Sequence, residues 1–207
     1  YGVGAMQSLR IEKALPLAGP DINGEQTPYE LGLHKWIDFS KREFIGRAAL
    51  LAVQERGLRQ RWVGLVLDGP APANPSDAVY SVADIAADRP ITAMDIDPNE
   101  EFDAERSGWN PIGRVTSSAF GYSVGKPLAL AYVDVSHTWP GARVLLGGGG
   151  GRPVTATVAN TPFFDPAGLR LRGTVEYTAQ EGGGSSTGSE GGESSRGGRG
   201  RKPRGER

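Results

Sequence analysis

The side chains that could do chemistry in this 207-residue chain are carboxylates and cations, because cysteine is absent and only two histidines, His34 and His137, are present. Without cysteine there is no disulfide framework, no thiolate metal site and no cysteine nucleophile. A Ser-His-Asp relay or a zinc site would have to rely on one isolated histidine. The sequence therefore predicts neither.

Three glycine-containing segments were candidates for a phosphate cradle, and none has the required spacing. Gly121 and Gly125 have three residues between them where a Walker loop needs four, and Pro127 stands where magnesium needs a hydroxyl. Residues 147–151 lack a following lysine and lie between two expected strands, so a hairpin connection is predicted there. Residues 2–4 are too short for a dinucleotide-binding loop.

Glu12 lies in the last turn of a short helix predicted over residues 4–13, so a carboxylate is placed at the end of an apolar stripe. The residues expected on the same face are Ala5, Ser8 and Leu9. A carboxylate offers two acceptors that can pair with two adjacent N–H donors of a ligand. The alternative is a helix-end glutamate that pairs with Lys13 or Arg10 or is solvated, and Arg10 itself is expected to brace the fold through a nearby carboxylate.

A second helix is predicted from the capping-box spacing of Ser40-Lys41-Arg42-Glu43 to about Arg56, with Gly57 placed to end it. Phe39 and Phe44 occupy the two positions of a hydrophobic staple. The face expected to be buried comprises Phe44, Ala48, Leu51 and Ala52. This helix is expected to serve packing more than chemistry.

After Gly57 the pattern becomes strand-like, which favours a small barrel or sandwich and a domain boundary near residue 58. The expected strands are Arg61–Asp68, Gly113–Ser117, Pro127–Val135, Ala142–Leu146, Pro153–Ala159 and Leu169–Tyr177. Residues 80–110 interrupt them with eight Asp/Glu against two Arg. We expect an exposed acidic insertion there; a calcium loop is the alternative, but its Asp-x-Asp-x-Asp-Gly spacing is absent.

Composition separates residues 181–207 from the rest, since they hold 10 of the 31 glycines and six Lys/Arg against four Asp/Glu. This composition predicts a disordered, solubilising tail rich in Gly, Ser and Arg. The alternative is a segment that makes a weak, salt-dependent contact with RNA. The remaining residues have 17 Lys/Arg against 20 Asp/Glu and are not a general nucleic-acid binder. No apolar stretch approaches the length of a membrane span.

Six segments in order resemble the glycine-cleavage T-protein (aminomethyltransferase) family over roughly residues 4–173, excluding the acidic insertion. They are Ser8–Lys13, Thr27–Leu33, Phe44–Leu50, Gly113–Ser117, Gly125–Val133 and Pro162–Arg170. Within the superfamily, residues 119–126 (Ala-Phe-Gly-Tyr-Ser-Val-Gly-Lys) are more similar to sarcosine and dimethylglycine dehydrogenases and related folate-dependent demethylases.

The resemblance implies an α+β chain: residues 1–57 as the C-terminal part of a folate-binding α/β domain, residues 58–180 as a small β-barrel domain, then the tail 181–207. It implies transfer of a one-carbon unit from an aminomethyl or N-methyl group to tetrahydrofolate. In the family, the glutamate of the block that contains Glu12 binds the pterin ring. We expect the partners to be a small amine or methyl donor, and a lipoyl carrier protein or a dehydrogenase domain.

Lys41, Arg42 and Tyr29 are also expected to bind the cofactor, and Tyr122 is a similar candidate. Lys41 and Arg42 would hold the acidic tail of folate from the first turn of the second helix, and the alternative is a solvated helix face. Tyr29 would line the pterin slot by stacking, as would Tyr122, and the alternative is a core or rim tyrosine.

No catalytic residue is nominated, because the family's essential aspartate is expected to precede Tyr1. FAD is expected only if a dehydrogenase domain also precedes it. Two functions stay open: part of a folate-dependent transferase, including a flavin-dependent sarcosine or dimethylglycine dehydrogenase, or a non-catalytic folate-binding module. We expect a cytoplasmic location.

Overall fold

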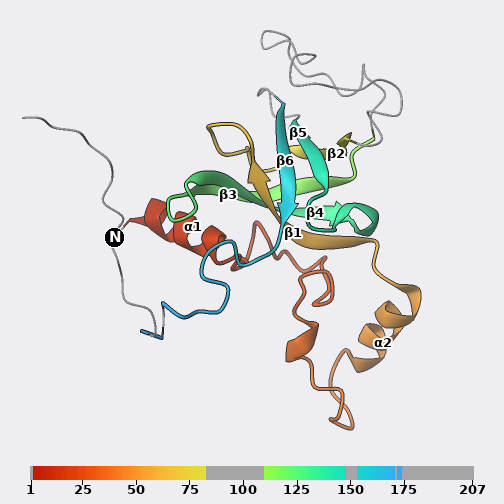
Figure 1. Ribbon diagram of the computed structural model, residues 1–207. Helices are drawn as coiled ribbons and strands as arrows, with labels where there is room; N and C mark the ends of the chain where they lie inside the picture. Colours follow the sequence, from red (N-terminus) through yellow and green to blue (C-terminus); the bar gives the residue numbers. More distant parts are fainter. Residues whose placement is uncertain (1, 83–109, 148–152, 171, 174–207) are drawn as a thin grey trace, which may run out of the picture.

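The structure, a computed structural model, describes residues 2–82, 110–147, 153–170 and 172–173. Six strands form a closed barrel, one helix lies on its outer surface, and a second helix follows a long loop below it (Figure 1). The helical elements are α1 (Val3–Glu12), η1 (His34–Trp36), α2 (Arg47–Arg56) and η2 (Val135–His137). The strands are β1 (Gln60–Leu67), β2 (Ala78–Ser81), β3 (Gly113–Gly121), β4 (Lys126–Asp134), β5 (Arg143–Gly147) and β6 (Val154–Ala159).

Every neighbouring pair of strands in the barrel is antiparallel, in the order β1-β4-β3-β2-β5-β6 with β6 returning to β1. Leu65 of β1, for example, lies opposite Ala129 of β4 and Val158 of β6. Alternate residues of each strand point inward and fill the barrel with small and branched apolar side chains. The barrel that the change of sequence period favours is therefore confirmed.

Strand β4 is buried on both faces. Its inward residues Ala129 and Ala131 join the barrel core, and its outward residues Leu128 and Leu130 pack with Ile11 of α1. Two covered faces explain why residues 127–133 read as a continuous apolar run instead of alternating. This contact fixes α1, and with it the end of the first predicted helix, against the barrel wall.

Helix α1 matches its prediction in position but not in its buried face. Ser8, Ile11 and Glu12 are buried. Leu9 is 59% exposed, and Val3 and Met6 are exposed as well. Helical spacing puts these three apolar side chains on the side opposite to the barrel.

Helix α2 begins later than the capping box predicts. The Ser40 hydroxyl donates to Asp38 Oδ1 instead of accepting from an amide of a helix start. The helix begins at Arg47 after Gly46, which has φ of +91°. Phe39 and Phe44 do meet edge to face, with centroids 5.8 Å apart, but before the helix instead of across its first turn. The buried residue of α2 is Val53, and Ala48 and Ala52 are exposed.

The strands differ from expectation in two places. The sequence does not predict the short strand β2. The described residues of the expected last strand form turns instead: Leu169, Arg170, Arg172 and Gly173. The glycine connection at 148–151 and most of the acidic insertion lie outside the described residues, as does the tail. The division into domains at residue 58 stays a prediction, and β1 begins at Gln60.

Candidate functional site

Glu12 is the last residue of α1 and is 2% exposed. Its Oε1 accepts a hydrogen bond of 2.7 Å from the backbone amide of Ser123, in the turn between β3 and β4. Its Oε2 receives no hydrogen bond from the described residues. One oxygen is therefore fixed by the barrel, and the other has no partner among the described residues.

The cations beside Glu12 are paired with other carboxylates. Lys13 Nζ lies 3.2 Å from Asp165 Oδ2, and Arg10 Nη1 lies 2.7 Å from Asp21 Oδ2. The alternative in which Glu12 forms an ion pair with Lys13 or Arg10 is therefore not observed. The expectation that Arg10 braces the fold through a carboxylate is met by Asp21.

Asp21 is the centre of a buried polar network that holds the chain after α1 against β3. Its Oδ1 accepts from the hydroxyls of Thr116 and Ser117, and its Oδ2 accepts from Arg10 and from the amide of Leu17 at 2.9 Å. Ser117 in turn accepts from Arg10 Nη2 at 2.9 Å. Because every member has a partner, the network fixes the helix end that carries Glu12.

Tyr132 of β4 extends this network from the barrel wall. Its hydroxyl donates to the backbone oxygen of Asp21 at 2.8 Å. Burial raises the pKa of Tyr132 well above its usual range, and the charges of Asp21 and Glu30 raise it further. The phenol consequently stays protonated and keeps its donor role at physiological pH.

The segment after β6 closes the other side of the helix end. The amide of Phe164 donates to the backbone oxygen of Glu12 at 3.2 Å. Lys13 Nζ and Arg170 Cζ lie over the Phe164 ring, 6.0 and 4.9 Å from its centroid. Although burial acts to raise the pKa of Asp165, hydrogen bonds from Lys13 and from backbone amides of Leu169 and Arg170 lower it overall. The ion pair with Lys13 is thus charged at neutral pH.

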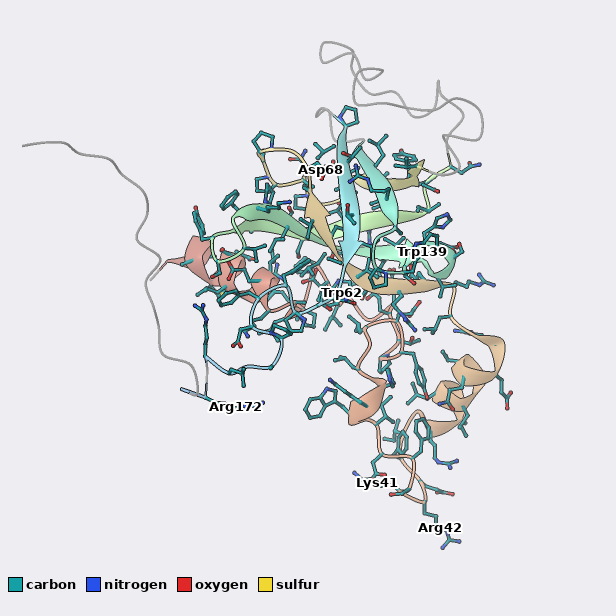
Figure 2. The ribbon with its side chains drawn as sticks, in the orientation of Figure 1. Lys41, Arg42, Trp62, Asp68, Trp139 and Arg172 are labelled. Atoms are coloured by element: carbon teal, nitrogen blue, oxygen red, sulfur yellow. The ribbon has the colours of Figure 1, made fainter. Side chains whose placement is uncertain are left out.

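Lys41, Arg42 and Tyr29, which are predicted to bind the cofactor, make no described contact with Glu12. Lys41 and Arg42 are exposed on the loop before α2, at the end of the molecule away from the barrel (Figure 2). Tyr29 is half-buried and stacks on His34, with centroids 6.4 Å apart. In the described ranges, no hydrogen bond, ion pair or ring contact joins any of the three to Glu12. Their assignment to the cofactor stays a prediction.

Tyr122 lies next to the amide that holds Glu12 and is 80% exposed. Its ring meets Phe120 edge to face, with centroids 5.2 Å apart.

Among the described residues, no group of three or more His, Cys, Asp or Glu could hold a metal ion. Within those same ranges, no helix has the length and apolar character of a membrane span.

Residues 60–165, just over half of the chain, match the family described as glycine cleavage T-protein C-terminal barrel domain. The chain belongs to the glycine cleavage T-protein family. This match covers the barrel from its first strand to Asp165, the residue that pairs with Lys13.

Curated T-protein relatives extend the similarity beyond the barrel. The aminomethyltransferase of Thermosynechococcus vestitus is 33% identical over 163 residues, which is 79% of this chain and 37% of the relative. The mitochondrial dimethylglycine dehydrogenase of Mus musculus is 31% identical over 196 residues, which is 90% of this chain and 19% of the relative. The chain thus spans less than two fifths of these relatives.

The fold of the T-protein family is also found among solved structures. The glycine cleavage system aminomethyltransferase T from Bartonella henselae superposes with a TM-score of 0.60 at 28% identity, over 78% of this chain and 38% of that one. The similarity therefore includes residues outside the matched barrel.

Proposed function

We propose that this chain is the folate-binding portion of an enzyme that transfers an aminomethyl or N-methyl carbon to tetrahydrofolate. The observation that carries the proposal is Glu12, a buried carboxylate whose Oε1 is fixed by the Ser123 amide while its Oε2 has no partner in the described part of the chain. Similarity to aminomethyltransferases supports it.

The chemistry of Glu12 fits a pterin ring. A carboxylate has about four lone-pair sites, so one hydrogen bond to Ser123 leaves acceptors on both oxygens. A pterin edge carries two adjacent N–H donors, and a charge-assisted, two-point contact fixes both position and orientation. An oriented but incompletely satisfied carboxylate is what such a contact requires.

The residues of this chain are assigned binding and orientation, not proton transfer. Tetrahydrofolate, when bound, supplies the nitrogen that accepts the one-carbon unit. The charged groups at the end of α1 are engaged in ion pairs, Lys13 with Asp165 and Arg10 with Asp21, so neither cation is available as a general acid in this arrangement.

A demethylating enzyme of the dimethylglycine dehydrogenase type is a second candidate. The specific observation in its favour is the length of the alignment, which covers 90% of this chain with the mouse enzyme but 79% with the cyanobacterial aminomethyltransferase. In that case the partner is a dehydrogenase domain, which would carry FAD, instead of a lipoyl carrier protein. A binding assay with dimethylglycine, sarcosine and an aminomethyl-loaded lipoyl protein would separate the two.

The proposal is tested by calorimetric titration of the Glu12→Gln variant with tetrahydrofolate. Because the variant keeps the shape but loses the charge, we expect affinity to fall about tenfold or more, with an unchanged circular dichroism spectrum. Glu25→Gln is the matched control, since Glu25 is exposed on a loop. Equal affinities of wild type and Glu12→Gln would refute the proposal.

A further inference from the structure

The turn between β3 and β4, residues 121–125, is a fixed element of the candidate site. Two backbone hydrogen bonds close it, from Val124 and Gly125 to the oxygen of Gly121, at 3.1 and 2.7 Å. Gly125 has φ of +73°, a conformation that favours glycine. The side chains that the turn presents are therefore held in place by the backbone.

The same turn lies directly against Glu12. Besides the Ser123 amide, Gly121 packs beside Glu12. A Cβ built on Gly121 would make an ordinary contact of 3.4 Å with Glu12 Cγ and would clash with Leu128 Cδ1 at 2.5 Å. The barrel thus takes part in the site through backbone groups of this turn. The site is not made by α1 alone.

Tyr122 is the side chain that this turn exposes between those two contacts. It is 80% exposed, although a large aromatic ring gains free energy when it is covered. Its edge-to-face contact with Phe120 leaves its outer ring surface uncovered by the described residues. An aromatic ring one residue from the amide that orients a carboxylate is an arrangement suited to a flat heterocycle with N–H donors on its edge.

We propose that Tyr122 is a ligand-contacting residue, whose ring stacks on the flat ring system that Glu12 grips by its edge. This inference rests on the proposed function, because it takes the ligand to be a folate. It assigns to the barrel a direct contact with the pterin part of the ligand. The contact depends on the aromatic ring and not on the hydroxyl.

The inference is tested by calorimetric titration of the full chain with two ligands. One is tetrahydrofolate, and the other is p-aminobenzoylglutamate, which lacks the pterin. We expect Tyr122→Ala to weaken tetrahydrofolate binding about tenfold, as loss of stacking does for nucleobases, and Tyr122→Phe to bind within about twofold of wild type. Affinity for p-aminobenzoylglutamate should not change in either variant. Trp139→Ala is the matched control, because Trp139 is 54% exposed on the side of the barrel away from α1 (Figure 2).

The Glu12→Gln variant, titrated in parallel, separates the two proposals. Weaker binding in Glu12→Gln with wild-type affinity in Tyr122→Ala overturns the inference and leaves the proposed function standing. Wild-type affinity in Glu12→Gln, or no binding by the wild type, overturns the proposed function and the inference with it. Equal losses in Tyr122→Phe and Tyr122→Ala overturn stacking in favour of the hydroxyl. Melting temperatures should stay equal, since Tyr122 is exposed.

Discussion

At the scale of single residues, the ion pair of Arg10 and Asp21 supports the site more than any charge on its surface. Their side chains are 10% and 0% exposed, and Asp21 has four hydrogen-bond donors around it. Removing one partner of a buried pair leaves the other charge uncompensated in a medium of low polarity. The pair therefore couples the stability of the fold to the position of Glu12.

We expect Asp21→Ala to lower the free energy of unfolding by about 3 to 5 kcal/mol, because Arg10 would remain buried without a counter-charge. Urea denaturation followed by tryptophan fluorescence measures the change. The control is Asp68→Ala: Asp68 pairs with Arg143 at 2.8 Å, but these side chains are 43% and 49% exposed. An exposed pair contributes about 0 to 1 kcal/mol, so similar losses in the two variants would contradict the prediction.

The family block predicts Glu12 as a cofactor-binding residue, but no sequence pattern predicts the group that orients it. Ser123 lies 111 residues away and contributes a backbone amide, so no side-chain pattern marks it. Asp21 follows a Gly-Pro turn and looks like any turn aspartate until the fold brings it to Thr116 and Ser117. A local sequence pattern cannot show a contact between residues that lie far apart in the chain.

At the scale of secondary structure, the sequence predicts the strands whose apolar residues alternate or form a continuous run. It does not predict the start of α2, where Ser40 has a competing hydrogen-bond partner, or the short strand β2. The capping box at Ser40 failed because its hydroxyl bonds to Asp38, and Gly46 then sets the start of α2. Strand β2 has four residues between turn residues and an acidic segment, too few to show a period. The boundaries of short elements thus depend on tertiary contacts.

Two glycines in different elements should respond oppositely to the same substitution. A Cβ on Gly113 of β3 would clash with the Tyr132 backbone oxygen and meet Val133 Cα at 2.9 Å. We therefore expect Gly113→Ala to lower the free energy of unfolding by about 1 to 3 kcal/mol. Gly4→Ala should raise it by about 0.5 to 1 kcal/mol, because Gly4 lies in α1 with open space around it. Thermal unfolding checks the signs, and a stabilised Gly113→Ala would refute the strand packing described.

The segment after β6 gives α1 a pH-dependent attachment through Asp165. The folded-state pKa of this carboxyl is below its ordinary value of 3.8, so its contribution to stability is present above about pH 4 and is lost as the pH falls through the lowered pKa. We expect the urea midpoint of Asp165→Asn to lie below that of wild type at pH 7. The difference should shrink between pH 4 and pH 2. A difference that is independent of pH would contradict this assignment.

At the scale of the whole molecule, the described contacts of the candidate site all lie between Ser8 and Arg170. Deleting residues 181–207 should therefore leave both the melting temperature and the affinity for tetrahydrofolate unchanged. Filter binding to single-stranded RNA at low and high salt measures the weak contact that the basic residues of this segment predict. A loss of tetrahydrofolate affinity on deletion would show that the tail contributes to the site.

The closed barrel has a consequence for how the protein can be modified. The chain leaves β2 and returns on β3, which is its hydrogen-bonded neighbour, with Val79 opposite Gly113. Because the two ends are held together by the sheet, a flexible insert between them costs only about 0.6 kcal/mol for each doubling of its length. This junction is accordingly a place where a reporter domain could be inserted or the connection shortened, because the paired strands β2 and β3 keep its two ends together.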